Sequence, residues 1–165
     1  MALACGCAVG GSAARAQTYA AVGASLPIGD FAPVANAGFG LALQSRTGQT
    51  FGVFDTRLDV TLDRFGGKGA ISRYQYTSFA VNLIRDIGES VYWLAGIGLY
   101  NAQDQLSAQF GGNSGTLTHS NGGVKAGVGA TFTVFRVGSF IEADVIRLFA
   151  PGKITWVPIR LGIRL

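Results

Sequence analysis

Few residues of this chain have types and spacing that could do chemistry. The one histidine, His119, is followed by Ser120, and a His with a Ser partner can supply the base and nucleophile of an acyl-transfer reaction. Adjacent side chains of an extended chain point in opposite directions, however, and both residues lie in or beside a long loop-like stretch rich in Gly and Asn. The pair therefore favours an ordinary loop histidine over a catalytic one.

Nine charged residues recur at alternate positions of extended segments, and they could act either as an acid pair or as ion pairs. The set contains five carboxylates and four bases: Asp55, Arg57, Asp59, Asp63, Lys125, Glu142, Asp144, Arg160 and Arg164. Each carboxylate has a base nearby in this pattern, so ion pairing explains the set more simply than acid–base catalysis does. No residues stand at metal-ligand spacing, Gly127 and Gly129 do not precede a helix as a nucleotide loop would, and no basic cluster indicates nucleic acid. We therefore expect no enzyme activity, no cofactor and no metal.

Extended segments with two unlike faces must position these charges. In residues 54–64, FDTRLDVTLDR, the even positions from 54 to 62 are mostly apolar, and the odd positions are mostly charged. A strand places alternate side chains on opposite faces, so this segment has one apolar wall and one charged wall. Segments with the same alternation occupy residues 18–26, 37–44, 54–64, 76–85, 91–101, 123–134, 140–149 and 155–165. Their length of roughly ten residues suits a tilted strand that crosses a bilayer. The pattern predicts an all-β fold, an eight-stranded antiparallel up-and-down transmembrane β-barrel.

The links between these segments alternate in length. Short, turn-like links are expected near residues 46–49, 86–89 and 136–139, and longer, glycine-rich links near 27–36, 65–73, 103–121 and 150–154. All the long links fall at the same end. Short periplasmic turns and longer outside loops are typical of outer-membrane barrels.

The composition indicates which wall faces water. Hydrophobic residues make up 48% of the chain and charged residues only 13%, about half of the roughly 25% typical of soluble domains. Many polar-wall positions are Gly, Ala or Ser, which would make room for large charged side chains inside a narrow barrel. We therefore expect the apolar walls to face lipid and the nine charges to form a salt-bridged interior. A soluble lipocalin-like carrier of apolar ligands is the alternative, and a narrow channel is a further one.

The sequence also predicts where several residues near the strand ends lie in the barrel. Arg147 falls on the lipid side, at the outer rim or after a bulge. Pro158 cannot donate to a ladder, so we expect it near the outer end, at a bulge or beside a strand that has stopped pairing. Aromatic residues near the ends are expected to form interfacial girdles, with Trp93, Phe132, Phe135 and Phe140 at the short-link end and Phe31, Phe149 and Trp156 at the long-link end.

The first 16 residues have the composition of a secretory signal peptide. They are rich in small apolar residues and end in Ala14, Arg15 and Ala16, an A-x-A cleavage pattern before Gln17. No basic residue precedes Arg15, so we expect the signal peptide to begin upstream of Met1. Cleavage would leave residues 17–165 as the barrel domain, without Cys5 and Cys7, and hence without disulfides.

Three of the segments, YWLAGIGLY, FIEADVIRL and WVPIRLGIRL, resemble small bacterial outer-membrane β-barrels of the OmpA/OmpX-like superfamily. The resemblance covers residues 17–165 and implies a monomer in the cell outer membrane, in contact with outer-membrane lipids and lipopolysaccharide. It implies a structural or surface protein whose outer loops serve envelope or surface interactions. Because some small barrels modify lipid A, a lipid A-modifying enzyme is another alternative.

The resemblance also implies that the barrel-assembly machinery reads the last strand as an insertion signal. That strand carries its apolar side chains in the expected register: Val157, Ile159, Leu161, Ile163 and Leu165. Leu165 stands where such barrels usually end in Phe.

Overall fold

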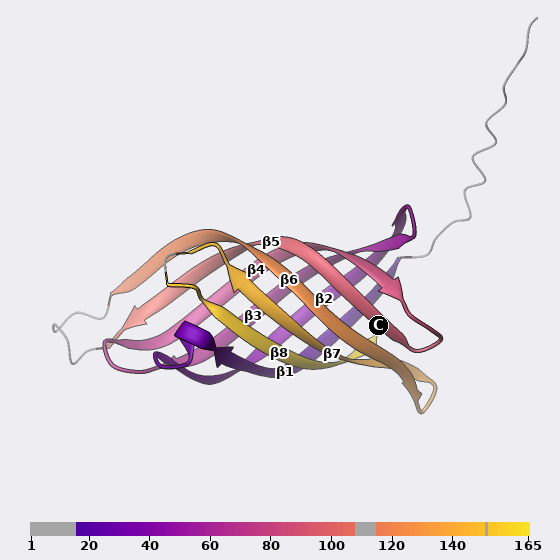
Figure 1. Cartoon of the computed structure of the whole chain (residues 1–165). Coiled ribbons are helices and arrows are strands. Elements are labelled where there is room, and N and C mark those ends of the chain that lie inside the picture. Colours follow the sequence, from indigo (N-terminus) through magenta and orange to yellow (C-terminus); the bar gives the residue numbers. More distant parts are fainter. Residues whose placement is uncertain (1–15, 108–114, 151) are drawn as a thin grey trace, which may run out of the picture.

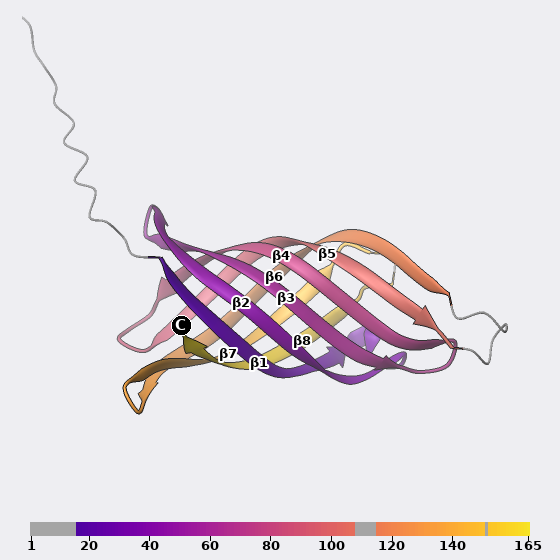
Figure 2. The same cartoon turned by 180° about the vertical axis from the view of Figure 1, so that it is seen from behind.

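Eight tilted strands wind into one closed barrel (Figures 1 and 2). The computed structural model describes residues 16–107, 115–150 and 152–165. Its elements are β1 (Gln17–Ile28), the 3-10 helix η1 (Gly29–Phe31), β2 (Ala35–Phe51), β3 (Phe54–Gly67), β4 (Ile71–Asp86), β5 (Val91–Leu106), β6 (Thr116–Val134), β7 (Val137–Leu148) and β8 (Thr155–Arg164). Each strand pairs antiparallel with the next, and β1 pairs with β8 to close the circle. The predicted eight-stranded up-and-down barrel is confirmed.

The alternation in the sequence sets the two surfaces of this barrel. In β3, Arg57, Asp59 and Asp63 are buried inside, whereas Val60 between them is 48% exposed on the outer wall. The same alternation leaves Val128 57% exposed and Leu161 54% exposed on β6 and β8. In the described part of the chain no helix is both long enough and apolar enough to cross a membrane. The predicted signal peptide falls almost wholly on residues outside the described ranges and stays a prediction.

The first short link was predicted at the wrong place. Strand β2 continues through residues 46–49 to Phe51, and the turn follows at Gly52 and Val53. Between Arg46 and Thr50 the register with β3 shifts, which marks an irregularity of the ladder, and Gly48 has a positive φ of 70° there. Glycine with this conformation serves a β-bulge as well as a turn, and sequence composition does not separate the two.

Two of the links predicted to be long are shorter than expected because their strands continue. Strand β3 runs to Gly67 and β4 starts at Ile71, so little of residues 65–73 forms a loop. Strands β5 and β6 likewise extend to Leu106 and from Thr116, and His119 pairs with Ala102 within this ladder. The polar composition of residues 103–121 suggested a loop, but paired backbone hydrogen bonds form a strand with polar side chains too.

The β6–β7 link is a tight two-residue turn formed by Phe135 and Arg136. It begins one residue before the predicted range of 136–139 and shares Arg136 with that range. Both residues have positive φ, 48° and 68°, although neither is glycine. This is the backbone geometry of the hairpin turn that best matches strand twist, here built from residues that favour it poorly.

Arg147 and Pro158 lie near the long-link end. Arg147 is exposed on the outer wall opposite Thr155, the first residue of β8, and the β6–β7 register is continuous, so no bulge precedes it. Pro158 pairs with Ser25 of β1, whereas the described β7–β8 ladder skips from Ile159 to Trp156. Pro158 therefore stands beside an interrupted ladder, as expected of a residue without an N–H.

Candidate functional site

Seven buried charged residues meet in the middle of the barrel and form what we call the ion-pair cluster. Its members are Arg57, Asp59, Asp63, Lys125, Glu142, Asp144 and Arg160, from β3, β6, β7 and β8. All are almost inaccessible to solvent. Buried charges persist only when they are paired and hydrogen-bonded, and every member of this cluster has a partner.

One half of the cluster centres on Arg57. Its guanidinium lies 2.6 Å from Glu142 Oε2 and 2.8 Å from Asp59 Oδ1. Glu142 also accepts hydrogen bonds from the Tyr92 hydroxyl at 2.8 Å and from Gln44 Nε2 at 3.2 Å. Five side chains from four strands, β2, β3, β5 and β7, thus hold one another across the barrel.

Lys125 joins the two halves of the cluster. Its Nζ lies 2.6 Å from Asp59, 3.3 Å from Asp144 and 3.8 Å from Glu142. On the other side, Arg160 lies 3.4 Å from Asp144 and 3.0 Å from Asp63.

Two of the nine predicted interior residues lie outside this cluster. Asp55 is half-buried near the short-link end, and Arg164 is exposed there. Glu142 and Asp144 of β7 lie on the strand next to Arg160 and Arg164 of β8. Only the Asp144–Arg160 contact forms, because Glu142 reaches across the barrel to Arg57 instead.

Four neutral partners of the cluster were not predicted from the sequence: Ser25, Gln44, Thr61 and Tyr92. The hydroxyl of Ser25 donates to Asp63 at 2.6 Å, while Gln44 and Tyr92 bind Glu142. Their signal was present, because each occupies the same face of its strand as the charges.

Glycines on the inner wall create the space that the large polar side chains fill. A Cβ at Gly40 would collide with the carboxylate of Asp63, and one at Gly127 would collide with that of Asp144. Gly96 makes room for Asn82 in the same way. The predicted role of small residues in the polar walls is thereby confirmed.

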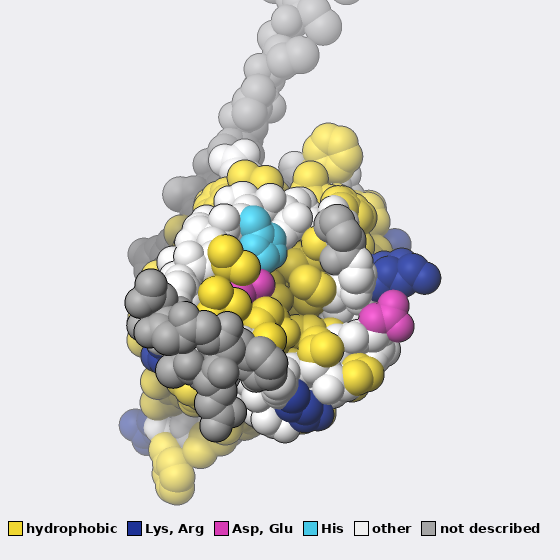
Figure 3. Space-filling model, turned by 90° about the vertical axis from the view of Figure 1, so that its left-hand side faces the viewer, with side chains coloured by type: hydrophobic (Ala, Val, Ile, Leu, Met, Phe, Trp, Pro, Cys, Tyr) yellow, Lys and Arg dark blue, Asp and Glu magenta, His cyan; other side chains and the backbone are white. Residues whose placement is uncertain are grey.

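At the long-link end the interior is filled by a cluster of aromatic rings, which we call the aromatic plug. It comprises Phe31, Phe65, Tyr74, Tyr76, Tyr100 and Trp156. Tyr76 stacks on Trp156 with ring centroids 5.1 Å apart, and Phe31 from η1 packs edge-on against Phe65 at 5.2 Å. Viewed from this end, hydrophobic side chains occupy the mouth of the barrel (Figure 3).

The plug corrects part of the predicted aromatic girdles. Phe31 and Trp156 point inward, and so does Phe140 at the other end. The outer wall does carry Phe149, Phe132 and the edge-on pair of Trp93 with Phe54. Trp156 and Arg160 are both at even positions of β8, so the alternation predicts that Trp156 faces inward. For this residue the alternation is a better predictor of orientation than its position near a strand end.

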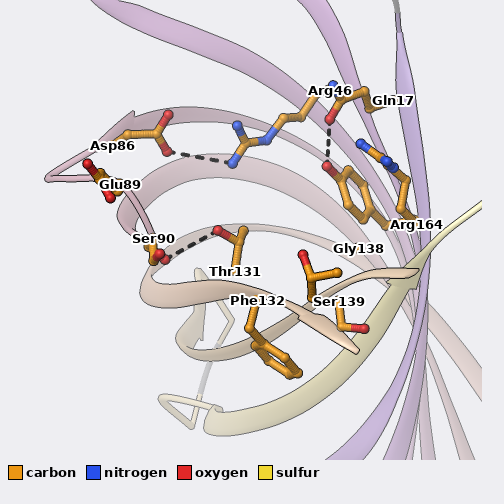
Figure 4. A pocket seen from close by; sticks show the side chains of 12 residues that line it. Gln17, Arg46, Asp86, Glu89, Ser90, Thr131, Phe132, Gly138, Ser139 and Arg164 are labelled. Carbon is orange, nitrogen blue, oxygen red and sulfur yellow. Dashed lines mark hydrogen bonds and ion pairs between the residues drawn. The ribbon is translucent and has the colours of Figure 1, made fainter. Parts of the chain in front are cut away.

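The short-link end opens into a polar cavity of about 480 Å³, which we call the vestibule (Figure 4). Tyr19, Arg46, Asp86, Thr131, Ser139 and Arg164 are among the residues that line it, and Arg46 lies 3.8 Å from Asp86. Deeper in, among Gln44, Arg57 and Tyr92, the free space shrinks to about 10 Å³. One water molecule needs roughly 10–15 Å³, so the vestibule ends against the ion-pair cluster.

The outer wall is apolar but carries charges of one sign. Arg64, Arg73, Arg85 and Arg147 occupy outward positions of β3, β4 and β7. The described strands have no outward carboxylate, since their Asp and Glu residues fall on inward positions.

Comparison with known proteins identifies the fold. No protein-family model and no curated relative matches the chain. Among solved structures, Ail, the attachment invasion locus protein of Yersinia pestis, is similar with a TM-score of 0.64 and 16% identity over 91% of this chain and 97% of Ail. The N-terminal β-barrel domain of Pseudomonas aeruginosa OprF matches with a TM-score of 0.63 and 11% identity over 91% and 97% of the two chains. Neisserial surface protein A matches with a TM-score of 0.54 and 16% identity over 92% and 98%. The chain therefore has the eight-stranded barrel fold of small outer-membrane proteins.

Proposed function

We propose that residues 17–165 form an integral outer-membrane protein that is monomeric, non-enzymatic and closed to diffusion, and that acts as a structural and surface-exposed element of the envelope. The observation that carries this proposal is the arrangement of the two walls. Apolar side chains cover the outside of the barrel, and the ion-pair cluster occupies its centre. An apolar exterior of this extent is stable in lipid and would drive aggregation in water.

The interior disfavours a lipocalin-like carrier. Such a carrier needs an apolar cavity, whereas the middle of this barrel holds paired charges and the vestibule is lined by Arg46, Asp86 and Arg164. A narrow channel is disfavoured because the aromatic plug and the ion-pair cluster both lie across the axis.

The geometry around His119 supports the absence of enzyme activity. His119 and Ser120 are successive residues of β6, so their side chains leave opposite faces. The Ser120 hydroxyl accepts a hydrogen bond from Asn101 Nδ2 at 3.2 Å on the outer face. The enzyme alternative would require loss of a lipid A modification on His119→Ala substitution.

A surface role is supported by the end of the barrel that carries the long links. There β6 pairs with β5 from Thr116 onward but with β7 only from Gly123, so residues 116–121 present one edge that no described strand covers. An open edge can accept an extended segment of another protein. Ail, by its name an attachment protein, has been crystallised with a heparin analogue, which agrees with surface recognition by this fold.

The outer wall supports contact with acidic lipids and lipopolysaccharide. Its outward arginines lack outward carboxylates, and cationic side chains near a membrane surface attract anionic headgroups. The apolar face of β8, which includes Ile159, Leu161 and Ile163, is exposed and would be available to the barrel-assembly machinery as an insertion signal.

Fractionation and gel mobility test the proposal. We expect the mature chain to stay in the outer-membrane fraction after urea or carbonate extraction. We also expect it to migrate differently on a gel before and after boiling, as closed barrels do. Release into the soluble fraction, or one mobility under both conditions, would contradict an integral barrel.

A further inference from the structure

An open apolar groove crosses the outer wall of β4, β5 and β6. Its volume is about 400 Å³, and we call it the glycine groove. Its side walls come from Phe79, Val81, Ile97, Leu99 and Phe149, and its floor includes the backbone of Gly98, Gly122 and Gly123. Ile97 and Leu99 are 67% and 69% exposed, among the most accessible aliphatic side chains of the barrel wall.

The groove exists because Gly122 leaves a gap between larger neighbours. Gly122 pairs with Leu99 of β5, and its carbonyl accepts a hydrogen bond from the backbone N–H of Phe149. A Cβ at Gly122 would lie 3.3 Å from the Phe149 ring and nowhere near backbone atoms. A side chain at this position would therefore fill the groove from the outside without disturbing the interior.

A positive charge stands beside the groove. Arg147 is two residues from Phe149 and opposite Val124 of β6, on the same outer face. Among the described residues no carboxylate lies within 4.0 Å of Arg147, because the ion pairs found there involve Arg46 and the ion-pair cluster. An uncompensated arginine next to an apolar surface suits a ligand with an acidic head and a long apolar tail.

We propose that the glycine groove binds one acyl chain of lipopolysaccharide while Arg147 binds a phosphate of the same lipid. The inference rests on the proposed function, which places the long links outside the cell. Phe149 lines the groove and directly follows β7 at the long-link end, and Arg147 lies two residues before it, so the groove lies toward the outer leaflet, where the phosphorylated glycolipid resides. Arginine binds phosphate oxygens through two parallel N–H donors, which gives the headgroup a fixed position beside the groove.

Native mass spectrometry on the folded mature chain in mild detergent tests this site. The protein is titrated with lipopolysaccharide and, separately, with phosphatidylglycerol. Two variants alter the site, Gly122→Leu, which fills the groove, and Arg147→Gln, which removes the charge. Two matched controls leave it intact: Ala126→Leu adds the same side chain at an outward position of β6 outside the groove, and Arg85→Gln removes an outward arginine at the opposite end.

We expect one retained lipopolysaccharide per wild-type barrel and in both controls. Retention should weaken by about fivefold in Arg147→Gln, the effect of one cationic side chain at a membrane surface. Retention should also fall in Gly122→Leu. Equal retention in all variants, or preferential retention of phosphatidylglycerol, would overturn the proposal.

The outcome is separable from that of the proposed function. If Gly122→Leu does not fold, Arg147→Gln still decides, because its side chain points away from the barrel interior. A chain that stays in the membrane and shifts on boiling, yet binds lipid equally with and without Arg147, would refute the groove and leave the integral barrel intact.

Discussion

Lys125 is the residue on which the interior depends most, because its ammonium contacts three carboxylates. The ion-pair cluster has four carboxylates and only three bases, so the carboxylates cannot all have equally close basic partners. Asp59 lies 2.6 Å from Lys125 and 2.8 Å from Arg57, whereas Asp144 lies 3.3 Å from Lys125 and 3.4 Å from Arg160. Of these two carboxylates, Asp144 therefore contributes less to the stability of the cluster.

Substitution of these two carboxylates should therefore have unequal effects. Asp59→Asn leaves Arg57 and Lys125 short of a close counter-charge and should lower the free energy of unfolding by roughly 3 kcal/mol. Asp144→Asn removes an excess negative charge and should cost less than half as much. Urea unfolding of the detergent-folded barrel measures both, and equal losses would contradict the ranking.

The space left by glycine gives a second prediction at this scale. A Leu at Gly127 would meet the carboxylate of Asp144, and its Cβ would lie 2.7 Å from the Ala143 carbonyl oxygen. We expect Gly127→Leu to destabilise the barrel by roughly 1–3 kcal/mol, the usual cost of overpacking. The neighbouring Ala126→Leu points to lipid and should be nearly neutral in the same unfolding assay. A similar loss in both variants would mean that the clash with Asp144 is not the cause.

The sequence determined which residues face inward but not which of them bind. Alternation placed Arg57, Lys125 and Glu142 on the inner wall, because a strand has a period of two. It could not pair Glu142 with Arg57, which is 85 positions away, since that contact depends on how the strands are staggered around the barrel.

The residues at which strands begin and end were the hardest feature to predict from the sequence. The turn placed at residues 46–49 is part of β2, and the loop placed at 103–121 is ladder at 103–106 and at 116–121. In both places the local composition suits a turn, and only the partner strand decides whether the backbone stays paired. The strand centres were predictable because burial of one face repeats there without interruption.

The β6–β7 turn offers a prediction at the scale of an element. Phe135 and Arg136 both adopt positive φ, a conformation that costs side-chain-bearing residues free energy. The double substitution Phe135→Asn and Arg136→Gly supplies the residues that favour this turn and should stabilise the barrel by about 1 kcal/mol. A shift of the urea midpoint to higher concentration checks it. As a control, Ile87→Asn, which precedes Gly88 in another turn, should bring no such gain.

Across the whole molecule, the barrel is closed at two levels and open at one end. The aromatic plug fills the long-link end, the ion-pair cluster fills the middle, and the vestibule opens at the short-link end. The free space beside Arg57 is only about 10 Å³, and an eight-stranded barrel has an interior that side chains fill, so we expect the ion-pair cluster and the aromatic plug each to block ions.

We therefore expect no steady conductance from the wild-type protein in planar bilayers. Phe31→Ala should also stay closed, because the loss of one ring from the plug leaves the ion-pair cluster in place. Regular current steps from this variant at neutral pH would show that the cluster does not seal the barrel.

The pairing of β1 with β8 has a consequence for the life of the protein. Ten residue pairs join the first strand to the last and close the barrel. Neither β1 nor β8 is therefore an unpaired edge strand at which unfolding could begin. Proteases cleave unfolded molecules, and a closed barrel that unfolds only as a whole is rarely unfolded. Copies already inserted would accordingly be shared between daughter cells at division, and their number would fall through growth and dilution more than through degradation.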